Sequence, residues 1–244
     1  MRDGIFYAVS VGPGEPDLLT LRSVRVLEKC PVICFPQTDS ASGKKHHIAF
    51  DAVRGAVPLA EKKILFFPFS MVPDCAAMRA EYEAAVSSCE SFLRQGMDVA
   101  FVSIGDVSLY STGSRIADLV RERGFEVRFV PGVNSFSVAA CEACLSFAGR
   151  DESVLIIPGD AFYIEETLRA ALLSPGTKIL MKMGRHLREI LALVDALGLS
   201  ERATLVQKAS LPGQKIFRDE ELRHLDDSVI ADSYLSILIV KNNA

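Results

Sequence analysis

Short apolar runs and mixed polar stretches alternate along this chain, and their lengths predict strands followed by helices. In the first half, runs rich in β-branched and aromatic residues predict five strands, at Phe6–Val11, Val32–Pro36, Ile64–Phe69, Val99–Ile104 and Val127–Val130. Helical patterns lie between them, at Asp17–Lys29, Ala76–Arg94 and Ser114–Arg123. The connection from Val53 to Lys63 shows no clear period. Near-continuous apolar strands joined by helices indicate a buried, largely parallel sheet.

The second half has a different order of elements. Strand and helix patterns first alternate, at Val154–Ile157, Glu165–Leu173, Lys178–Met183, Leu187–Leu197 and Thr204–Gln207. Two strands then follow with little helix between them, Gln214–Arg218 and Ser233–Lys241, which predicts antiparallel pairing and a mixed sheet. We therefore expect two α/β domains, residues 1–132 and 133–244, divided after Pro131-Gly132. No long linker separates them, so a cleft is expected between the two.

The composition is that of a globular protein with a sizeable core, because 49% of its residues are hydrophobic. A net charge of −4 disfavours a nucleic-acid partner, which usually requires a basic face. The longest apolar runs, such as Leu235–Val240, fall short of the ~20 residues of a membrane span. No signal-peptide pattern stands at the N-terminus. We expect a cytoplasmic protein with neither a nucleic-acid nor a membrane partner.

The chain contains six cysteines, Cys30, Cys34, Cys75, Cys89, Cys141 and Cys144. The last two form a CxxC pair, a spacing that redox and metal sites also use. Their small and apolar neighbours predict a helix, and neither a second CxxC nor a histidine pair at zinc-finger spacing stands nearby. Core packing is the favoured interpretation of the pair, and no metal site is expected.

Three glycine-containing turns follow predicted strands, the position where α/β proteins place ligands. The first, Val11–Asp17, superficially suggests a dinucleotide fingerprint, but Pro13 and Pro16 interrupt the GxGxxG spacing. Proline also lacks the N–H that a phosphate would need, and no GxxxxGK[ST] sequence occurs in the chain. A rigid wall for an uncharged or cationic group fits this turn better, and a plain strand-to-helix turn is the alternative.

The other two turns are Ser103–Thr112 and Val130–Ser137. In the former, Gly105 would let the backbone approach a ligand closely, and Asp106 would place a carboxylate beside it. As a helix N-cap, Asp106 would need no ligand. The latter again has the order strand, tight turn and helix.

The motifs of the chain resemble those of a known family. VGPGEPDLLTLR, GDVSLYST, PGVNSFSVAA, MKMGR and QKASLPGQKI, taken together from about Phe6 to Lys241, are similar to the tetrapyrrole methylases of cobalamin and sirohaem synthesis. LYST, SFS after PG, and YLSILIVK are most like the branch that methylates C20 of precorrin-2 or cobalt-factor II. The resemblance implies two α/β domains around an active-site trough, a homodimer, S-adenosylmethionine as methyl donor and a tetrapyrrole substrate.

Carried over motif by motif, the resemblance implies a set of donor contacts: Pro13, Ile104, Gly105, Asp106, Leu109, Asn134, Ser135, Met183 and Ala209. The sequence departs from the family pattern at Val107, where proline is common, and at Asn134, where threonine or serine is frequent. Both positions are read mainly through the backbone. The methylated carbon must lose a proton, and Asp106 or a bound water would accept it.

A tetrapyrrole carries many carboxylates, so cations are expected at the rim of the site. Candidates lie in the polar loop Gln37–His47 and in the second half: Lys44, Lys45, His46, His47, Lys182, Arg185 and Lys208. For each, an ordinary solvated charge is the alternative. Leu65–Met71 would pack either on the macrocycle or in the core. One alternative is a methylase of the same fold that acts at another tetrapyrrole position. Another is a methylase of RNA or of a protein histidine, and the pI of about 5.7 disfavours RNA. The non-enzyme alternative is a regulator that binds S-adenosylmethionine or a nucleotide.

Overall fold

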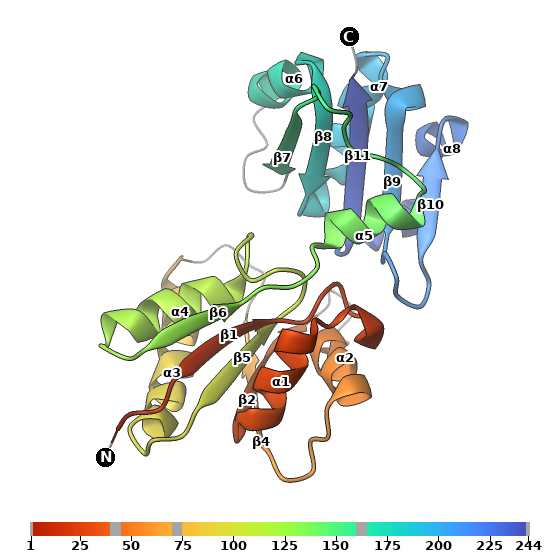
Figure 1. Ribbon diagram of the computed structural model, residues 1–244. Coiled ribbons are helices and arrows are strands. Elements are labelled where there is room, and N and C mark those ends of the chain that lie inside the picture. Colours follow the sequence, from red (N-terminus) through yellow and green to blue (C-terminus); the bar gives the residue numbers. More distant parts are fainter. Residues whose placement is uncertain (1, 40–44, 70–74, 160–164, 243–244) are drawn as a thin grey trace. The chain divides into compact units, whose positions relative to one another are not determined.

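The structure is a computed structural model that describes residues 2–39, 45–69, 75–159 and 165–242 (Figure 1). The chain divides into two compact units, Met1–Asn134 and Ser135–Ala244. The sequence placed a domain boundary two residues earlier, after Gly132. Each unit is described by itself below.

The first unit is built on a sheet whose strands run in the order β4-β2-β5-β1-β6, all parallel, with the short β3 antiparallel to the end of β2. Its elements are β1 (Phe6–Ser10), η1 (Pro16–Leu18), α1 (Leu21–Lys29), β2 (Val32–Asp39), β3 (Lys45–His46), α2 (Ile48–Ala56), β4 (Lys63–Pro68), α3 (Cys75–Leu93), β5 (Val99–Ser103), α4 (Thr112–Glu122) and β6 (Val127–Val130). The predicted parallel sheet is therefore confirmed.

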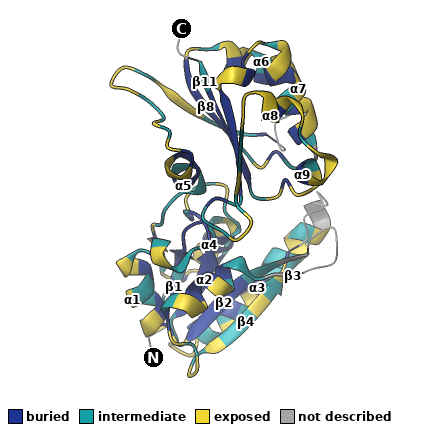
Figure 2. Cartoon of the chain, turned by 90° about the vertical axis from the view of Figure 1, so that its right-hand side faces the viewer, coloured by how far each residue is buried: buried dark blue, intermediate teal, exposed yellow. Residues whose placement is uncertain are grey.

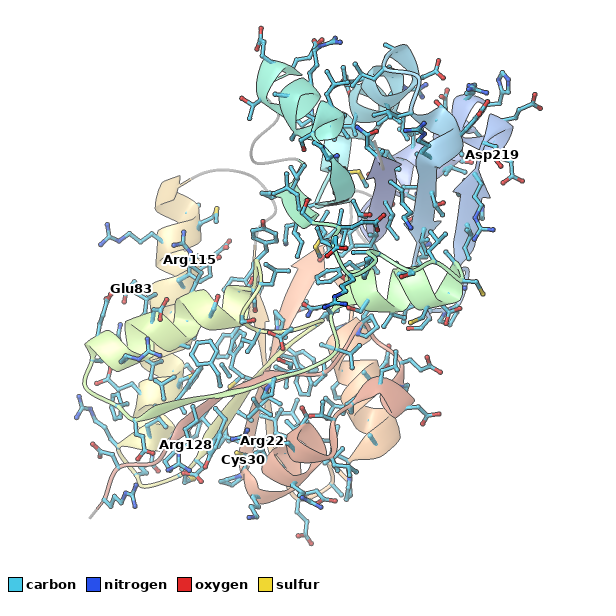
Figure 3. The ribbon with its side chains drawn as sticks, turned by 45° about the horizontal axis from the view of Figure 1, so that its top comes forward. Arg22, Cys30, Glu83, Arg115, Arg128 and Asp219 are labelled. Atoms are coloured by element: carbon cyan, nitrogen blue, oxygen red, sulfur yellow. The ribbon has the colours of Figure 1, made fainter. Side chains whose placement is uncertain are left out.

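Alternate side chains of each strand enter different cores, one on each face of this sheet. Phe6 and Ala8 of β1 belong to the core that α3 and α4 cover, whereas Val9 belongs to the core under α1 and α2. Between α3 and α4, Arg123 binds two carboxylates of α3, those of Glu83 and Glu90 (Glu83 is labelled in Figure 3). Both faces of the sheet are thus covered by helices, as the unbroken apolar strands predicted.

Two local expectations for this unit were wrong, and one connection that the sequence left unassigned contains part of a helix. The predicted helix Asp17–Lys29 is split into η1 and α1, because Thr20 is extended and its Oγ1 accepts a hydrogen bond from Ser23 N at 3.1 Å as an N-cap. The connection from Val53 to Lys63, which had no clear period, begins with the last four residues of helix α2. The expected loop Gln37–His47 includes the end of β2 and the paired strand β3.

The second unit contains a mixed sheet of order β10-β9-β11-β8-β7, in which only β7 and β8 are parallel neighbours among the described strands. Its elements are α5 (Ser135–Glu142), β7 (Val154–Pro158), α6 (Glu165–Leu173), β8 (Gly176–Met181), η2 (Gly184–His186), α7 (Leu187–Ala196), η3 (Ser200–Arg202), β9 (Ala203–Gln207), β10 (Lys215–Arg218), α8 (Glu220–Arg223), α9 (Asp227–Ala231) and β11 (Ser236–Asn242). The central strands β8 and β11 are buried (Figure 2). The predicted mixed sheet is confirmed.

Details of the second unit differ from the expectation. Strand β8 ends at Met181 rather than at Met183, because Lys182 takes a left-handed φ of 51°. Two short helices, α8 and α9, occupy the stretch where little helix was expected. No helix among the described residues is long and apolar enough to cross a membrane.

The expected core packing of the CxxC pair is wrong. Cys141 and Cys144 are both exposed. Helix α5 ends at Glu142, and Cys144 lies beyond it with a φ of 52°. Ala143, between the two cysteines, takes the buried position instead, with 1% of its surface exposed.

Candidate functional site

The three glycine-containing turns of the first unit follow strands that are direct neighbours. β1 pairs with β5 on one side and with β6 on the other, both in parallel. The carboxyl ends of parallel strands meet at one edge of a sheet, so the turns after β1, β5 and β6 lie side by side (Figure 1).

Backbone hydrogen bonds join the first and second turns. Gly105 N donates to Gly12 O at 2.6 Å, and the two glycines form an isolated antiparallel bridge. Val107 N donates to the hydroxyl of Ser10 at 2.8 Å. Gly12 and Gly105 have φ angles of 65° and 76°, a region that favours glycine, so the bridge depends on both residue types.

Asp106 joins the second and third turns. Its Oδ2 accepts a hydrogen bond from Gly132 N at 2.7 Å, and its Oδ1 accepts from Ser108 N at 2.9 Å and from the Ser108 hydroxyl. Partial burial acts to raise the pKa of Asp106, but the hydrogen bonds from Gly132 and Ser108 outweigh it, so the pKa lies below its usual value. The side chain is therefore a carboxylate at neutral pH.

Gly132 and Gly105 shape the space around this tie in opposite ways. A Cβ on Gly132 would lie 2.4 Å from Ser10 Cβ and 2.8 Å from Gly105 O, so no side chain fits between the turns. A Cβ on Gly105 would meet no heavy atom within 4 Å. We call the three turns joined through Gly12, Asp106 and Gly132 the cradle. The cradle is closed on the Gly132 side and open beside the backbone of Gly105, where a ligand can approach.

The structure brings the predicted donor contacts of the first unit to this edge. Pro13 is buried in the first turn, and Ile104, Asp106 and Leu109 are half-buried around Gly105. Asn134 follows two residues after Gly132, and Ser135 begins helix α5. The wall for an uncharged or cationic group that the first turn predicts stays a prediction.

Met183 and Ala209 share one edge of the second sheet. They follow β8 and β9, which flank the start of β11, where Met181 lies opposite Ile237 and Gln207 opposite Ser236. The side chain of Met183 is fully buried in the core of this unit, and Ala209 is 6% exposed. Contacts of Met183 with a donor would therefore run through its backbone.

The turns at this second edge contain residues whose strained backbone conformation the sequence did not predict. Lys182, Lys208 and Ser210 have φ angles of 51°, 52° and 59°, although none is glycine. Ser210 Oγ is buried and has no hydrogen-bond partner among the described residues. No sequence signal indicates this conformation, because lysine and serine also occur in turns with ordinary φ angles.

The structure describes the side chains of only some of the candidate rim cations. Lys44 lies outside the described residues, as do the side chains of Lys45, His46 and Arg185. His47 packs edge-on against Phe66 with ring centroids 5.4 Å apart, and the ammonium of Lys208 pairs with Asp232.

The Leu65–Met71 segment packs mostly in the core. Leu65 and Phe67 pack on the core of the first unit, and Phe69 belongs to it, whereas Phe66 is 39% exposed. Ser70 and Met71 lie outside the described residues.

Comparison with known proteins identifies the class. A model of the tetrapyrrole (corrin/porphyrin) methylases matches residues 6–225. The chain therefore belongs to this family of methylases, as the sequence motifs predicted.

The individual relatives match over nearly the whole chain. It is 29% identical to the cobalt-precorrin-2 C(20)-methyltransferase of Salmonella typhimurium, covering 98% of this chain and 97% of that protein. It is 32% identical to the probable cobalt-precorrin-2 C(20)-methyltransferase of Methanocaldococcus jannaschii, covering 96% and 95%. The precorrin-2 C(20)-methyltransferase of Sinorhizobium is 25% identical and covers 85% of each chain.

Solved structures share the fold. A cobalt precorrin-4 methyltransferase superposes with a TM-score of 0.72 at 21% identity, covering 97% of this chain and 94% of that one. A uroporphyrin-III C-methyl transferase from Thermus thermophilus, complexed with S-adenyl homocysteine, superposes with a TM-score of 0.66 at 20% identity and covers 98% of each chain. At these identities the likeness is one of fold.

Proposed function

We propose that the protein transfers a methyl group from S-adenosylmethionine to C20 of precorrin-2 in its cobalt form, in the synthesis of the corrin ring. The observation that carries this proposal is the cradle in which Gly12, Asp106 and Gly132 tie three turns together and leave the backbone of Gly105 open. Its position at the carboxyl edge of a parallel sheet is the usual place for a small ligand.

The donor would be held by the same residues that the family resemblance implies: Pro13, Ile104, Gly105, Asp106, Leu109, Asn134, Ser135, Met183 and Ala209. S-adenosylmethionine supplies, when bound, an electrophilic methyl on a cationic sulfur. The chain therefore needs neither a metal nor a covalent nucleophile, only alignment and exclusion of water. Alignment of two reactants can contribute about 7–11 kcal/mol to lowering a barrier.

The proton lost from C20 after methyl transfer needs an acceptor. Asp106 is ionised and is part of the cradle, so it is one candidate. Its two oxygens already accept three hydrogen bonds, and these lower its basicity. This geometry favours a water molecule as the acceptor, with Asp106 holding the turns in place.

The cobalt form of the substrate is proposed because the relatives at 29% and 32% identity carry cobalt in their names, whereas the relative named for precorrin-2 alone is 25% identical. The homodimer and the cytoplasmic location that the sequence implied complete the proposal. Light scattering of the purified protein tests the dimer.

The reaction is tested with methyl-labelled S-adenosylmethionine and either cobalt-precorrin-2 or metal-free precorrin-2, under anaerobic conditions. We expect faster labelling of the cobalt form, with NMR of the product placing the label at C20. Label at another carbon would show that the protein methylates another position of the tetrapyrrole. Binding of S-adenosylhomocysteine without methylation of either tetrapyrrole would favour a regulator or a different substrate.

A further inference from the structure

Tyr110 has a backbone conformation that its residue type disfavours. Its φ is 48°, and it is the only non-glycine residue with a positive φ among the described residues of the first unit. Elsewhere in that unit the left-handed positions are occupied by glycines such as Gly12, Gly105 and Gly124. A glycine at position 110 would take this conformation without strain, so the tyrosine costs folding free energy there.

The neighbours of Tyr110 on both sides hold the backbone in this conformation. Before it, Leu109 N donates to Asp106 O at 3.2 Å and closes a turn. After it, Ser111 caps helix α4 by accepting from Gly113 N at 3.0 Å, and its hydroxyl donates to that of Ser103 at 3.0 Å. A Cβ on Gly113 would lie 2.3 Å from Ser103 Oγ, so α4 starts directly against β5. Tyr110 therefore cannot take a common φ without breaking either the Ser111 cap or the hydrogen bond from Leu109 N to Asp106 O.

Packing of the Tyr110 ring inside the protein does not offset the free energy of this strain. It is 40% exposed and makes no hydrogen bond, ion pair or ring contact with any described residue. Other exposed aromatic side chains have such contacts; Phe129, for example, lies under the guanidinium of Arg121. Strain that is held by the surrounding structure and that serves no internal contact is typical of a functional site.

From this combination we propose that Tyr110 is a specificity-determining residue whose ring stacks on the flat conjugated macrocycle of the substrate, an inference that rests on the proposed function. Tyr110 lies on the same turn as Gly105 and Asp106, five and four positions after them, and its side chain is exposed. Aromatic rings stack on flat conjugated systems in an offset arrangement, and this ring is 40% exposed and therefore accessible to such a partner. The adenine of the methyl donor is also flat, so the test separates the two ligands.

Four variants carry the test: Tyr110→Phe, Tyr110→Gly, Tyr110→Ala and, as an exposed aromatic control, Phe129→Ala. For each, calorimetry gives the Kd of S-adenosylhomocysteine, and initial rates give KM and kcat for the tetrapyrrole. We expect Tyr110→Gly and Tyr110→Ala to raise KM for the tetrapyrrole at least tenfold with a Kd for S-adenosylhomocysteine within twofold of wild type. Tyr110→Phe and Phe129→Ala should resemble the wild type. Tyr110→Gly should melt at a higher temperature than Tyr110→Ala, because only glycine relieves the strain.

An unchanged KM in the two ring-free variants would overturn the proposal. A parallel loss of S-adenosylhomocysteine affinity would overturn it in favour of stacking on the adenine, and a Phe variant as impaired as Gly would overturn it in favour of a role of the hydroxyl. Equal melting temperatures of the Gly and Ala variants would remove the strain on which it rests. If the wild type itself methylates no tetrapyrrole, the proposed function fails. Failure of the Tyr110 proposal alone would instead leave an active wild type whose variants have an unchanged KM.

Discussion

The carboxylate of Asp106 accepts a hydrogen bond from the backbone N–H of Gly132 at 2.7 Å, across 26 positions of sequence. This bond links the turn after β5 to the turn after β6, while the other carboxylate oxygen is held by Ser108. The turn after β1 is fixed to the same assembly through Gly12 and Gly105. The Asp106 side chain and the Gly12–Gly105 bridge together thus set the spacing of turns that come from three parts of the sequence.

Replacement of Asp106 by asparagine should loosen this assembly. An amide presents one acceptor oxygen where the carboxylate presents two, so either Gly132 N or the Ser108 donors would face an NH2 group. We expect a loss of about 1–3 kcal/mol in the free energy of unfolding, together with weaker binding of S-adenosylhomocysteine. Urea unfolding and calorimetry measure the two effects. Asp118→Asn is the matched control, because Asp118 is exposed on α4 and its carboxylate pairs with Arg121 at the surface. Turnover and affinity equal to the wild type in Asp106→Asn would show that the tie is dispensable.

The same carboxylate predicts a pH dependence of stability. The pKa of Asp106 is lower in the folded protein than its usual value, so the unfolded state binds the proton more readily. Its contribution is therefore complete above the unfolded pKa of about 3.9 and is lost as the pH falls through the lower folded pKa. The difference in unfolding free energy between wild type and Asp106→Asn should shrink as the pH is lowered from about 6 towards about 3, a range that includes the unfolded pKa of about 3.9. A difference that stays constant over this range would contradict the assignment.

Gly132→Ala tests the closed side of the cradle. The added methyl would lie 2.4 Å from Ser10 Cβ and 2.8 Å from Gly105 O, so the turns after β1 and β5 would have to move apart. We expect a destabilisation of about 1–3 kcal/mol, the usual range for overpacking, and reduced affinity for S-adenosylhomocysteine. Thermal melting and calorimetry measure both. Gly149→Ala is the control, because its methyl would meet nothing closer than 3.8 Å. Equal stability of the two variants would mean that the turns are not packed as described.

The parts of the fold that depend on local pattern were predictable from the sequence. Strand β6 and helix α6 have the bounds that the pattern gave, because apolar period and turn residues fix both ends. Helix α2 was missed for a physical reason. Gly55, one residue before its end, weakens the helical signal, and the helix is held by burial of Ala49, Ala52 and Val53 against the sheet.

The site was predictable only as a set of turns. The motifs indicated which turns carry chemistry, but not that β1 lies between β5 and β6, which is what brings the turns together. The hydrogen bond from Gly132 to Asp106 depends on that strand order. The left-handed φ of Tyr110, Lys182 and Lys208 could not be predicted, because none of these residues is a glycine and their types do not favour that conformation. The exposure of Cys141 and Cys144 likewise depends on where α5 ends.

The open side of the cradle gives the sharpest test of donor binding. Gly105 and Gly124 both have left-handed φ angles, 76° and 87°, and a Cβ on either would meet no heavy atom within 4 Å. Alanine at either position should therefore cost a similar amount of stability, about 1–2 kcal/mol from backbone strain. Gly124 lies in the turn between α4 and β6, at the amino-terminal end of that strand, whereas Gly105 lies at the carboxyl edge in the cradle. Only Gly105→Ala should place a methyl where the donor approaches, and we expect it alone to weaken S-adenosylhomocysteine binding, by tenfold or more in Kd (about 1.4 kcal/mol). Calorimetry on the two variants at matched stability separates strain from obstruction, and equal affinities would place the donor elsewhere in the molecule.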